Sequence, residues 1–348
     1  MSPVPVPRTY RCPVLLLLTM GMALLAPHAA AVAGAPARAR SPAAASIVWP
    51  APPDPARIRF VRTLDPMSAQ GAPSLVTKMW RTLVGGRDPI RMRQPYGIAV
   101  GADGKLYVAD TAGGTIHVYG LTKPGYAAIR VKATSLIGIA ASAGRLFVTD
   151  SVAGTVQALD LKGRATWSLG RSAGFQRPTG IVAAGDRLYV VDTVLNAVVM
   201  LSLSGEWVGA FGGQGSGDGQ LNFPTNIARG RDGRLRVTDM MNFRVQTFDP
   251  EGRFVGAFGR LGDGPGDLDK PKGVALDSDG HVYVVEGLRD VVQIFDPSGR
   301  LLLVFGGSGS GDGELWLPSG ITIADDLIFV ADAANGRVQV YEYLKVGP

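Results

Sequence analysis

A Gly-rich segment that recurs three times at a constant interval constrains the fold of this chain more than any other feature. The copies read GGQGSGDGQLNFP, GRLGDGPGDLDKP and GGSGSGDGELWLP, and they begin at Gly212, Gly259 and Gly306. Each step is 47 residues, and self-similarity at a fixed period of this size is typical of repeat architectures. Because a loop dedicated to an active site normally occurs once, the three copies favour an architectural role over a phosphate or calcium loop.

A β-patterned segment that ends in an acidic residue extends this repeat to six copies. These segments are KLYVAD, RLFVTD, RLYVVD, RLRVTD, HVYVVE and LIFVAD. Their acidic residues are Asp110, Asp150, Asp192, Asp239, Glu286 and Asp332, at spacings of 40, 42, 47, 47 and 46 residues. One short strand pattern precedes each segment and two follow it in most copies, with Asp-Gly and similar pairs at the turns, as tight hairpins require.

Four antiparallel strands in each of six repeated units predict an all-β fold, a six-bladed β-propeller over residues 94–344. The sixth unit stops at RVQVYEYL and lacks its fourth strand. Residues 57–64, RIRFVRTL, are β-patterned and are expected to supply that strand, because an open ring would leave exposed strand edges. The Gly-rich segments then join the outer strand of one blade to the inner strand of the next.

The repeats resemble a known family. Segments such as LNFPTNIARGRDGRLRVTDMMNFRVQTFDPEGRFVGAFG resemble NHL repeats, and the resemblance covers about residues 94–344. It is clear in copies three to six and weaker in copies one and two, where VKATSLIG replaces the Gly-rich loop of copy two. The resemblance implies a six-bladed propeller, and it implies binding rather than a fixed chemistry.

Residues 1–33 predict a cleavable signal peptide and a periplasmic or secreted protein. Arg8 and Arg11 precede the apolar run 14–26, which is too short to span a bilayer comfortably, and small residues follow. Retention of this segment as a membrane anchor is the alternative. The only cysteine, Cys12, lies before the apolar run, so the mature chain is expected to contain no disulfide.

Two segments separate the signal peptide from the first blade. Residues 34–56 are rich in Pro and Ala and predict an extended, poorly ordered leader. Residues 74–84 carry apolar side chains at helical spacing and predict one short helix before blade 1. We expect this helix to pack on the propeller; contact of residues 74–84 with a membrane surface, through Trp80, is the alternative.

The charge distribution argues against a nucleic-acid partner. Residues 1–93 carry a net charge of +9 and residues 94–348 a net charge of −3. A nucleic-acid platform carries its basic charge on the folded domain, whereas here it belongs to the N-terminal arm.

The sequence predicts no metal or other cofactor. Beyond the signal peptide there are only two histidines, His117 and His281, whereas a catalytic zinc takes three protein ligands. Residues 275–286 come near a calcium-loop pattern, but Ala275 occupies its first ligand position. A Ca²⁺ ion held at the central channel with help from Asn226 and Glu286 remains an open alternative.

The candidate site residues are departures from the repeat. The repeated acids are expected to accept backbone N–H groups in the turn that follows them. Glu286 replaces Asp, Asn226 stands where other copies carry Gly, and Lys272 is expected to lie at the channel mouth. We expect one loop face to bind the ligand through a set of seven residues: Asn226, Met241, Phe243, Arg244, Lys272, Glu286 and Arg289.

These observations favour an exported, non-catalytic scaffold that binds a protein, peptide or glycan through one loop face. The alternative is a periplasmic metal-dependent hydrolase or lyase with its site at the central channel. The scarcity of histidines and the lack of a complete acidic cluster disfavour that alternative.

Overall fold

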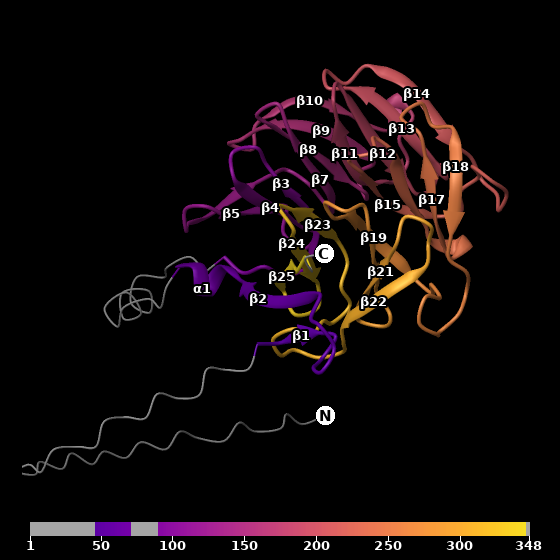
Figure 1. Ribbon diagram of the computed structural model, residues 1–348. Coiled ribbons are helices and arrows are strands. Elements are labelled where there is room, and N and C mark those ends of the chain that lie inside the picture. Colours follow the sequence, from indigo (N-terminus) through magenta and orange to yellow (C-terminus); the bar gives the residue numbers. More distant parts are fainter. Residues whose placement is uncertain (1–45, 71–89, 346–348) are drawn as a thin grey trace, which may run out of the picture. The chain divides into compact units, whose positions relative to one another are not determined.

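Six antiparallel sheets, five with four strands and one with five, are arranged in a ring (Figure 1). The computed structural model describes residues 46–70 and 90–345. The innermost strands of neighbouring sheets contact one another in ring order, and β23 of the last sheet contacts β3 of the first, which closes the ring. The predicted all-β, six-bladed propeller is therefore confirmed.

Blades 1 to 5 run from the innermost to the outermost strand in chain order, and blade 6 begins in the same way with its three C-terminal strands. Blades 1 and 2 comprise β3 (Pro95–Val100), β4 (Lys105–Asp110), β5 (Thr115–Gly120), β6 (Tyr126–Arg130), β7 (Leu136–Ser142), β8 (Arg145–Asp150), β9 (Thr155–Asp160) and β10 (Ala165–Leu169). Blades 3 and 4 comprise β11 (Pro178–Ala184), β12 (Arg187–Asp192), β13 (Ala197–Ser202), β14 (Trp207–Gly212), β15 (Pro224–Arg229), β16 (Leu235–Asp239), β17 (Arg244–Phe248) and β18 (Phe254–Phe258). Blades 5 and 6 comprise β19 (Pro271–Leu276), β20 (Val282–Glu286), β21 (Val291–Phe295), β22 (Leu301–Gly306), β23 (Ile321–Ala324), β24 (Leu327–Asp332) and β25 (Arg337–Tyr343). Two 3₁₀ turns, η1 (Arg171–Ala173) and η2 (Met240–Asn242), lie between strands.

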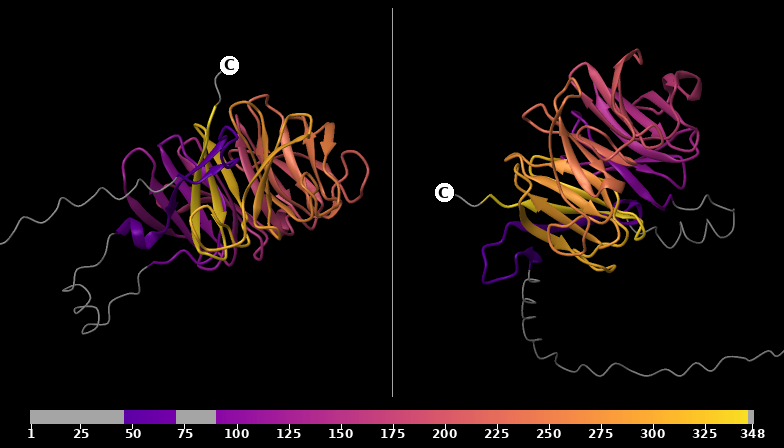
Figure 2. Two further views of the ribbon diagram at one scale, coloured as in Figure 1. Left: turned by 60° about the horizontal axis from the view of Figure 1, so that its bottom comes forward. Right: turned by 90° about the vertical axis from the view of Figure 1, so that its right-hand side faces the viewer.

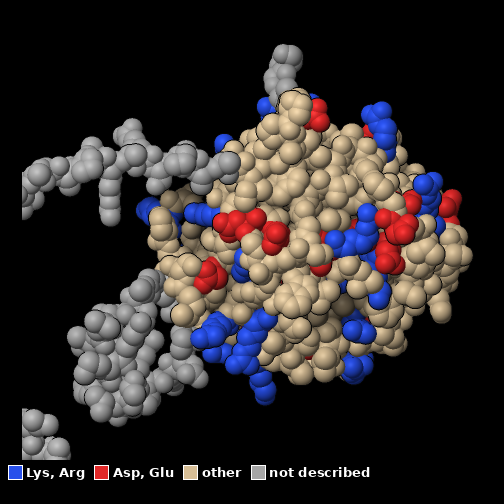
Figure 3. Space-filling model, turned by 90° about the horizontal axis from the view of Figure 1, so that it is seen from below, with Lys and Arg blue, Asp and Glu red and all other residues tan. Residues whose placement is uncertain are grey.

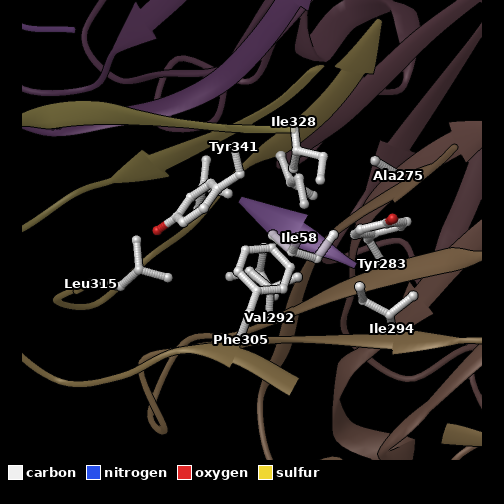
Figure 4. Close-up of a cluster of buried hydrophobic side chains, with 12 residues drawn as sticks. Ile58, Ala275, Tyr283, Val292, Ile294, Phe305, Leu315, Ile328 and Tyr341 are labelled. Atoms are coloured by element: carbon white, nitrogen blue, oxygen red, sulfur yellow. The ribbon is translucent and has the colours of Figure 1, made fainter. Parts of the chain in front are cut away.

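An N-terminal strand completes blade 6, as predicted. β2 (Ile58–Leu64) pairs antiparallel with β25, from Ile58 opposite Tyr343 to Leu64 opposite Val338 (Figures 1 and 2). Ile58 is fully buried in an apolar cluster with residues of blades 5 and 6 (Figure 4). The ring is thus closed by pairing between the two ends of the described chain.

The predicted leader 34–56 ends earlier than expected. Its last part, residues 46–56, contains β1 (Val48–Trp49), which pairs with β2 at the outer edge of blade 6. The Trp49 ring lies 5.9 Å from that of Phe305 and 5.8 Å from that of Tyr341, centroid to centroid. These aromatic contacts hold residues 46–56 against blade 6. The prediction of a poorly ordered leader was wrong for this part because it considered only the Pro and Ala content.

Among the described residues, one short helix, α1 (Pro66–Gln70), precedes blade 1. Asp65 caps it by accepting hydrogen bonds from the backbone N–H groups of Met67 and Ser68. The helix predicted over residues 74–84, its membrane contact, and the signal peptide over residues 1–33 all fall outside the described residues. Within the described part of the chain, no helix has the length and apolar character needed to cross a membrane.

Glycines let the innermost strands approach one another closely around the channel. A Cβ added to Gly320 would collide with the carbonyl oxygen of Tyr96, and one added to Gly138 with that of Thr179. Asn226 stands at the equivalent position of blade 4 and turns its own side chain back, so that Oδ1 accepts the N–H of Ile227 at 2.7 Å. The channel that remains has a volume of about 230 Å³.

Candidate binding face and its rim loops

On one face of the propeller, the repeated acids bind the segment that enters each blade. Asp150 is buried, and its carboxylate accepts the N–H groups of Val152 and Ala153 in the following turn at 3.1 and 3.0 Å. It also accepts the N–H groups of Thr134 and Ser135, just before the innermost strand. The predicted turn chemistry is confirmed in blades 1 to 3, where the acids accept backbone N–H groups of the following turn. It is wrong for Asp239 and Asp332, which instead bind the side chains of an asparagine and an arginine, and for Glu286. In every blade the acid also accepts at least one backbone N–H group from the segment that enters the blade.

The Gly-rich segments form three rim loops, residues 213–223, 259–270 and 307–320, on this same face. We call it the rim-loop face; it also carries the turn between the second and third strands of every blade. The buried residues Leu221, Leu268 and Leu315 anchor the rim loops between blades.

Each rim loop closes around an arginine and a glutamine of the blade that it enters. In blade 6, Arg337 donates to the carbonyl oxygens of Ser310, Gly311 and Glu314 at 2.8, 2.7 and 3.0 Å. Gln339 Oε1 accepts the N–H of Gly313 at 2.9 Å. In this loop the carbonyl oxygens turn toward a guanidinium of the protein itself, which is opposite to the inward N–H groups of a phosphate loop.

Blade 4 repeats this arrangement around Asp239. Its Oδ2 accepts hydrogen bonds from Arg244 Nε at 2.8 Å and Gln246 Nε2 at 2.9 Å. The Arg244 guanidinium also donates to the carbonyl oxygens of Gly217 and Gln220 at 2.8 and 2.9 Å. Arg244, one of the predicted ligand residues, is therefore occupied in holding its rim loop.

Blade 5 departs from the pattern, and its acid is left partly unsatisfied. Glu286 is fully buried, and its Oε2 accepts the N–H groups of Asp269 and Lys270 at 3.1 and 3.0 Å. Its Oε1 has no hydrogen-bond partner among the described residues. Arg289 lies two residues earlier in the turn than Arg244 does and donates instead to the carbonyl oxygens of Gly264 and Asp267. Burial raises the pKa of Glu286.

In blade 1 a histidine takes the place of the glutamine. His117 is fully buried, with Nε2 3.2 Å from Asp110 Oδ2 and Nδ1 2.9 Å from the Tyr126 hydroxyl. Gln246 and Gln339 stand at the same position of blades 4 and 6. His117 therefore serves the repeat as a buried hydrogen-bonding residue.

Besides Leu261, Trp316 and Leu317 in the rim loops, the rim-loop face carries exposed apolar side chains that follow the repeat. The second residue after each acid is apolar, and in blades 2 to 5 it is large and exposed. These four residues, the apolar crown, are Val152, Val194, Met241 and Leu288, with exposed fractions of 59, 47, 47 and 53%. Only Met241 was predicted as a site residue. Aligning the copies on their acids would have shown the other three.

The remaining predicted site residues lie around the crown and the channel mouth. Phe243 is half-buried beside Met241, in a left-handed conformation with φ of 55°. Asn226 lines the channel, and the Lys272 backbone lies beside it, since Thr225 Oγ1 donates to the Lys272 carbonyl at 3.2 Å. Burial lowers the pKa of Lys272. Within residues 46–70 and 90–345, no three His, Cys, Asp or Glu side chains come together in a metal-binding group.

Comparisons with known proteins agree with this fold. The NHL repeat model matches residues 315–341, and the model for the outer membrane protein assembly factor BamB matches residues 77–234. The NHL repeat match and the six-bladed ring support the resemblance to NHL-repeat β-propellers. No curated protein matches.

Several solved structures share the fold. A streptogramin B lyase is 16% identical with a TM-score of 0.57, over 74% of this chain and 96% of that one. A gluconolactonase from Xanthomonas campestris is 17% identical with a TM-score of 0.57, over 87% and 99%. An auxiliary nutrient binding protein from Bacteroides thetaiotaomicron is 13% identical with a TM-score of 0.56, over 74% and 71%. At these identities the similarity demonstrates the fold alone.

Proposed function

We propose that this protein is an exported, non-catalytic scaffold whose rim-loop face binds a protein or peptide. The apolar crown is the observation that carries the proposal. Single exposed apolar residues are normal on protein surfaces. Here, however, large apolar side chains recur at one repeat position in four consecutive blades, and such a patch is typical of an interaction site.

The chemistry of the crown favours a polypeptide over a glycan. Val152, Val194, Met241 and Leu288 offer aliphatic surface, which gains most from burial against apolar side chains of a partner. Met241 adds a flexible thioether that adapts to different shapes. Phe243, in the same turn as Met241, supplies an aromatic surface, and Lys272, on the innermost strand β19, supplies a cationic group.

Export rests on two independent observations. The N-terminal segment has the basic, apolar and small-residue order of a signal peptide. The match over residues 77–234 to an outer membrane protein assembly factor supports a periplasmic location.

A peptide library displayed on phage and selected on the mature protein tests the proposal. Selected peptides should bind the wild-type protein with a measurable Kd in calorimetry. They should lose at least tenfold in affinity when the four crown residues are changed together to Ser. The matched control changes Val208, Val255 and Leu302 to Ser; these residues are also apolar and exposed but lie on outermost strands.

Equal loss in the control variant, or full affinity in the crown variant, would contradict the assignment of this face. Metal analysis of the same preparation addresses the alternative function. Stoichiometric Ca²⁺ or Zn²⁺ in the purified protein would favour a hydrolase or lyase at the channel instead.

A further inference from the structure

A second pocket lies on the rim-loop face at blade 1, away from the apolar crown. Its volume is about 470 Å³. Its described lining residues come from the entry into blade 1 and from strands β4 to β6: Ile90, Arg91, Arg93, Asp110, Gly113, Thr115 and Arg130. Small-molecule sites in proteins have volumes of roughly 300–1,000 Å³, so this pocket has room for more than an inorganic ion.

The pocket lies where blade 6 holds its rim loop. In blade 6, the residue opposite Asp332 at the start of β25 is Arg337, which donates hydrogen bonds to carbonyl oxygens of the rim loop. In blade 1, the residue opposite Asp110 at the start of β5 is Thr115, which is too short to do so. The guanidinium comes from the outermost strand instead, since Arg130 Nη1 donates to Thr115 Oγ1 at 3.1 Å.

Positive charge is in excess in this pocket. Among the described lining residues, three are arginines and Asp110 is the only acid. The Asp110 carboxylate is buried and already accepts the N–H groups of Arg93 and Gln94 at 2.8 and 3.0 Å, besides its contact with His117. Arg91 and Arg93 are exposed, and neither forms an ion pair with a carboxylate of the described residues.

This imbalance is local. Over the face of the protein drawn in Figure 3, basic and acidic side chains are largely interspersed, although a group of Lys and Arg gathers at its lower edge. Residues 94–348 as a whole carry a net charge of −3. A pocket with three arginines and one satisfied acid is therefore not explained by the average composition of the propeller.

We propose that this pocket binds the phosphate or carboxylate group of a small organic anion. Guanidinium groups bind both kinds of group through paired N–H donors. The Arg130 guanidinium donates to Thr115 Oγ1 and to the Gly113 carbonyl on one side of the pocket, while Arg91 and Arg93 belong to the chain entering the blade. The site differs from the apolar crown in its blade and in its chemistry, and it does not depend on the proposed function.

Calorimetry with inorganic pyrophosphate and with citrate, at low salt, tests this inference on the mature protein. Either anion should bind saturably, and the Kd should rise at least tenfold when Arg91 and Arg93 are both changed to Gln. The matched control changes Arg231 and Arg234 to Gln. Both are exposed arginines of the hairpin between β15 and β16, which lies on the face of the propeller opposite the rim-loop face. An unchanged melting temperature confirms that each variant folds.

Two results would overturn the inference: no saturable binding of either anion, or the same affinity in the Arg91/Arg93 variant as in the wild-type protein. Sedimentation with anionic vesicles separates the two sources of a phosphate group. If pyrophosphate competes with vesicles, the pocket accepts lipid headgroups as well as soluble anions. If vesicles bind and neither soluble anion does, the attraction belongs to a surface and the pocket assignment is wrong.

Discussion

Blade 6 and blade 1 are neighbours in the ring, yet they differ at the residue that pairs with the repeated acid. In blade 6, Arg337 and Gln339 hold a Gly-rich rim loop against the blade. In blade 1, Thr115 and His117 stand at the corresponding positions, and a basic pocket opens above them. The repeated position that holds a rim loop in blades 4 and 6 carries a short side chain in blade 1, where it leaves room for the pocket that we propose to bind an anion.

The largest expected effect concerns the outer edge of blade 6. Removing residues 34–66 deletes β1 and β2, exposes the edge of β25 and empties the site of the buried Ile58. Large-to-small changes at one buried aliphatic residue cost about 2–5 kcal/mol, so loss of the whole strand should lower the melting temperature by more than 10 °C or cause aggregation. Thermal unfolding with light scattering measures both. Removing residues 34–45 alone should change neither, and an unchanged melting temperature for the larger deletion would contradict the closure.

The second prediction compares the two arginines directly. Arg337→Met should destabilise the protein by about 3 kcal/mol, because it leaves the fully buried Asp332 without its charged partner. Arg130→Met in blade 1 should cost less than about 1 kcal/mol, since Arg130 has no carboxylate partner among the described residues and bonds only neutral oxygens. Denaturant unfolding of both variants provides the comparison, and equal losses would show that the two blades are not used differently.

The third prediction uses the two acids of blades 4 and 5. Asp239→Asn should destabilise the protein by about 2 kcal/mol, because it weakens the bonds from Arg244, Gln246 and Asn222. Glu286→Gln should instead raise the melting temperature by about 2 °C at pH 8, since it removes a buried charge with an unpaired oxygen.

The stability gained by Glu286→Gln is expected to depend on pH. The pKa of Glu286 is raised by burial, so its protonated form is favoured in the folded state. The Glu286 carboxyl therefore stabilises the folded state fully below its pKa in the unfolded chain, and this stabilisation is lost as the pH rises through its pKa in the folded protein. The advantage of Glu286→Gln should therefore shrink as the pH is lowered toward 4. Melting curves across this range decide, and an advantage that grows toward acid would refute the explanation.

The smallest effect is expected for His117→Gln, which gives blade 1 the residue of blades 4 and 6. The amide can still donate to Asp110 and accept from Tyr126, so stability should change by less than about 1 kcal/mol. His117→Leu is the control, and it should cost about 2 kcal/mol by leaving both partners unsatisfied. A large loss for the glutamine variant would mean that the imidazole has a role beyond the repeat.

The repeat period, the closing strand and the buried leucines of the rim loops could all be predicted from the sequence, because each follows from spacing and strand patterning. The roles of Arg244 and Arg289 could not. Their guanidinium groups fold back over loops that precede them by about 25 residues, which no local pattern reveals. The unpaired oxygen of Glu286 likewise depends on where Arg289 points. The basic pocket could not be predicted from the sequence. Arg91 and Arg130 are far apart in the chain and line the same pocket because Arg130 lies on the outermost strand of blade 1.

Hydrogen exchange with and without pyrophosphate tests the contrast between blades 6 and 1 most directly. Without the anion, the amide of Gly313 should exchange slowly because Gln339 holds it. With pyrophosphate, the account predicts slower exchange in residues 90–94 and 111–115 and no change in residues 307–317. Protection of residues 307–317 by the anion, with none in residues 90–94, would show that the rim loops are the ligand site and would contradict the account.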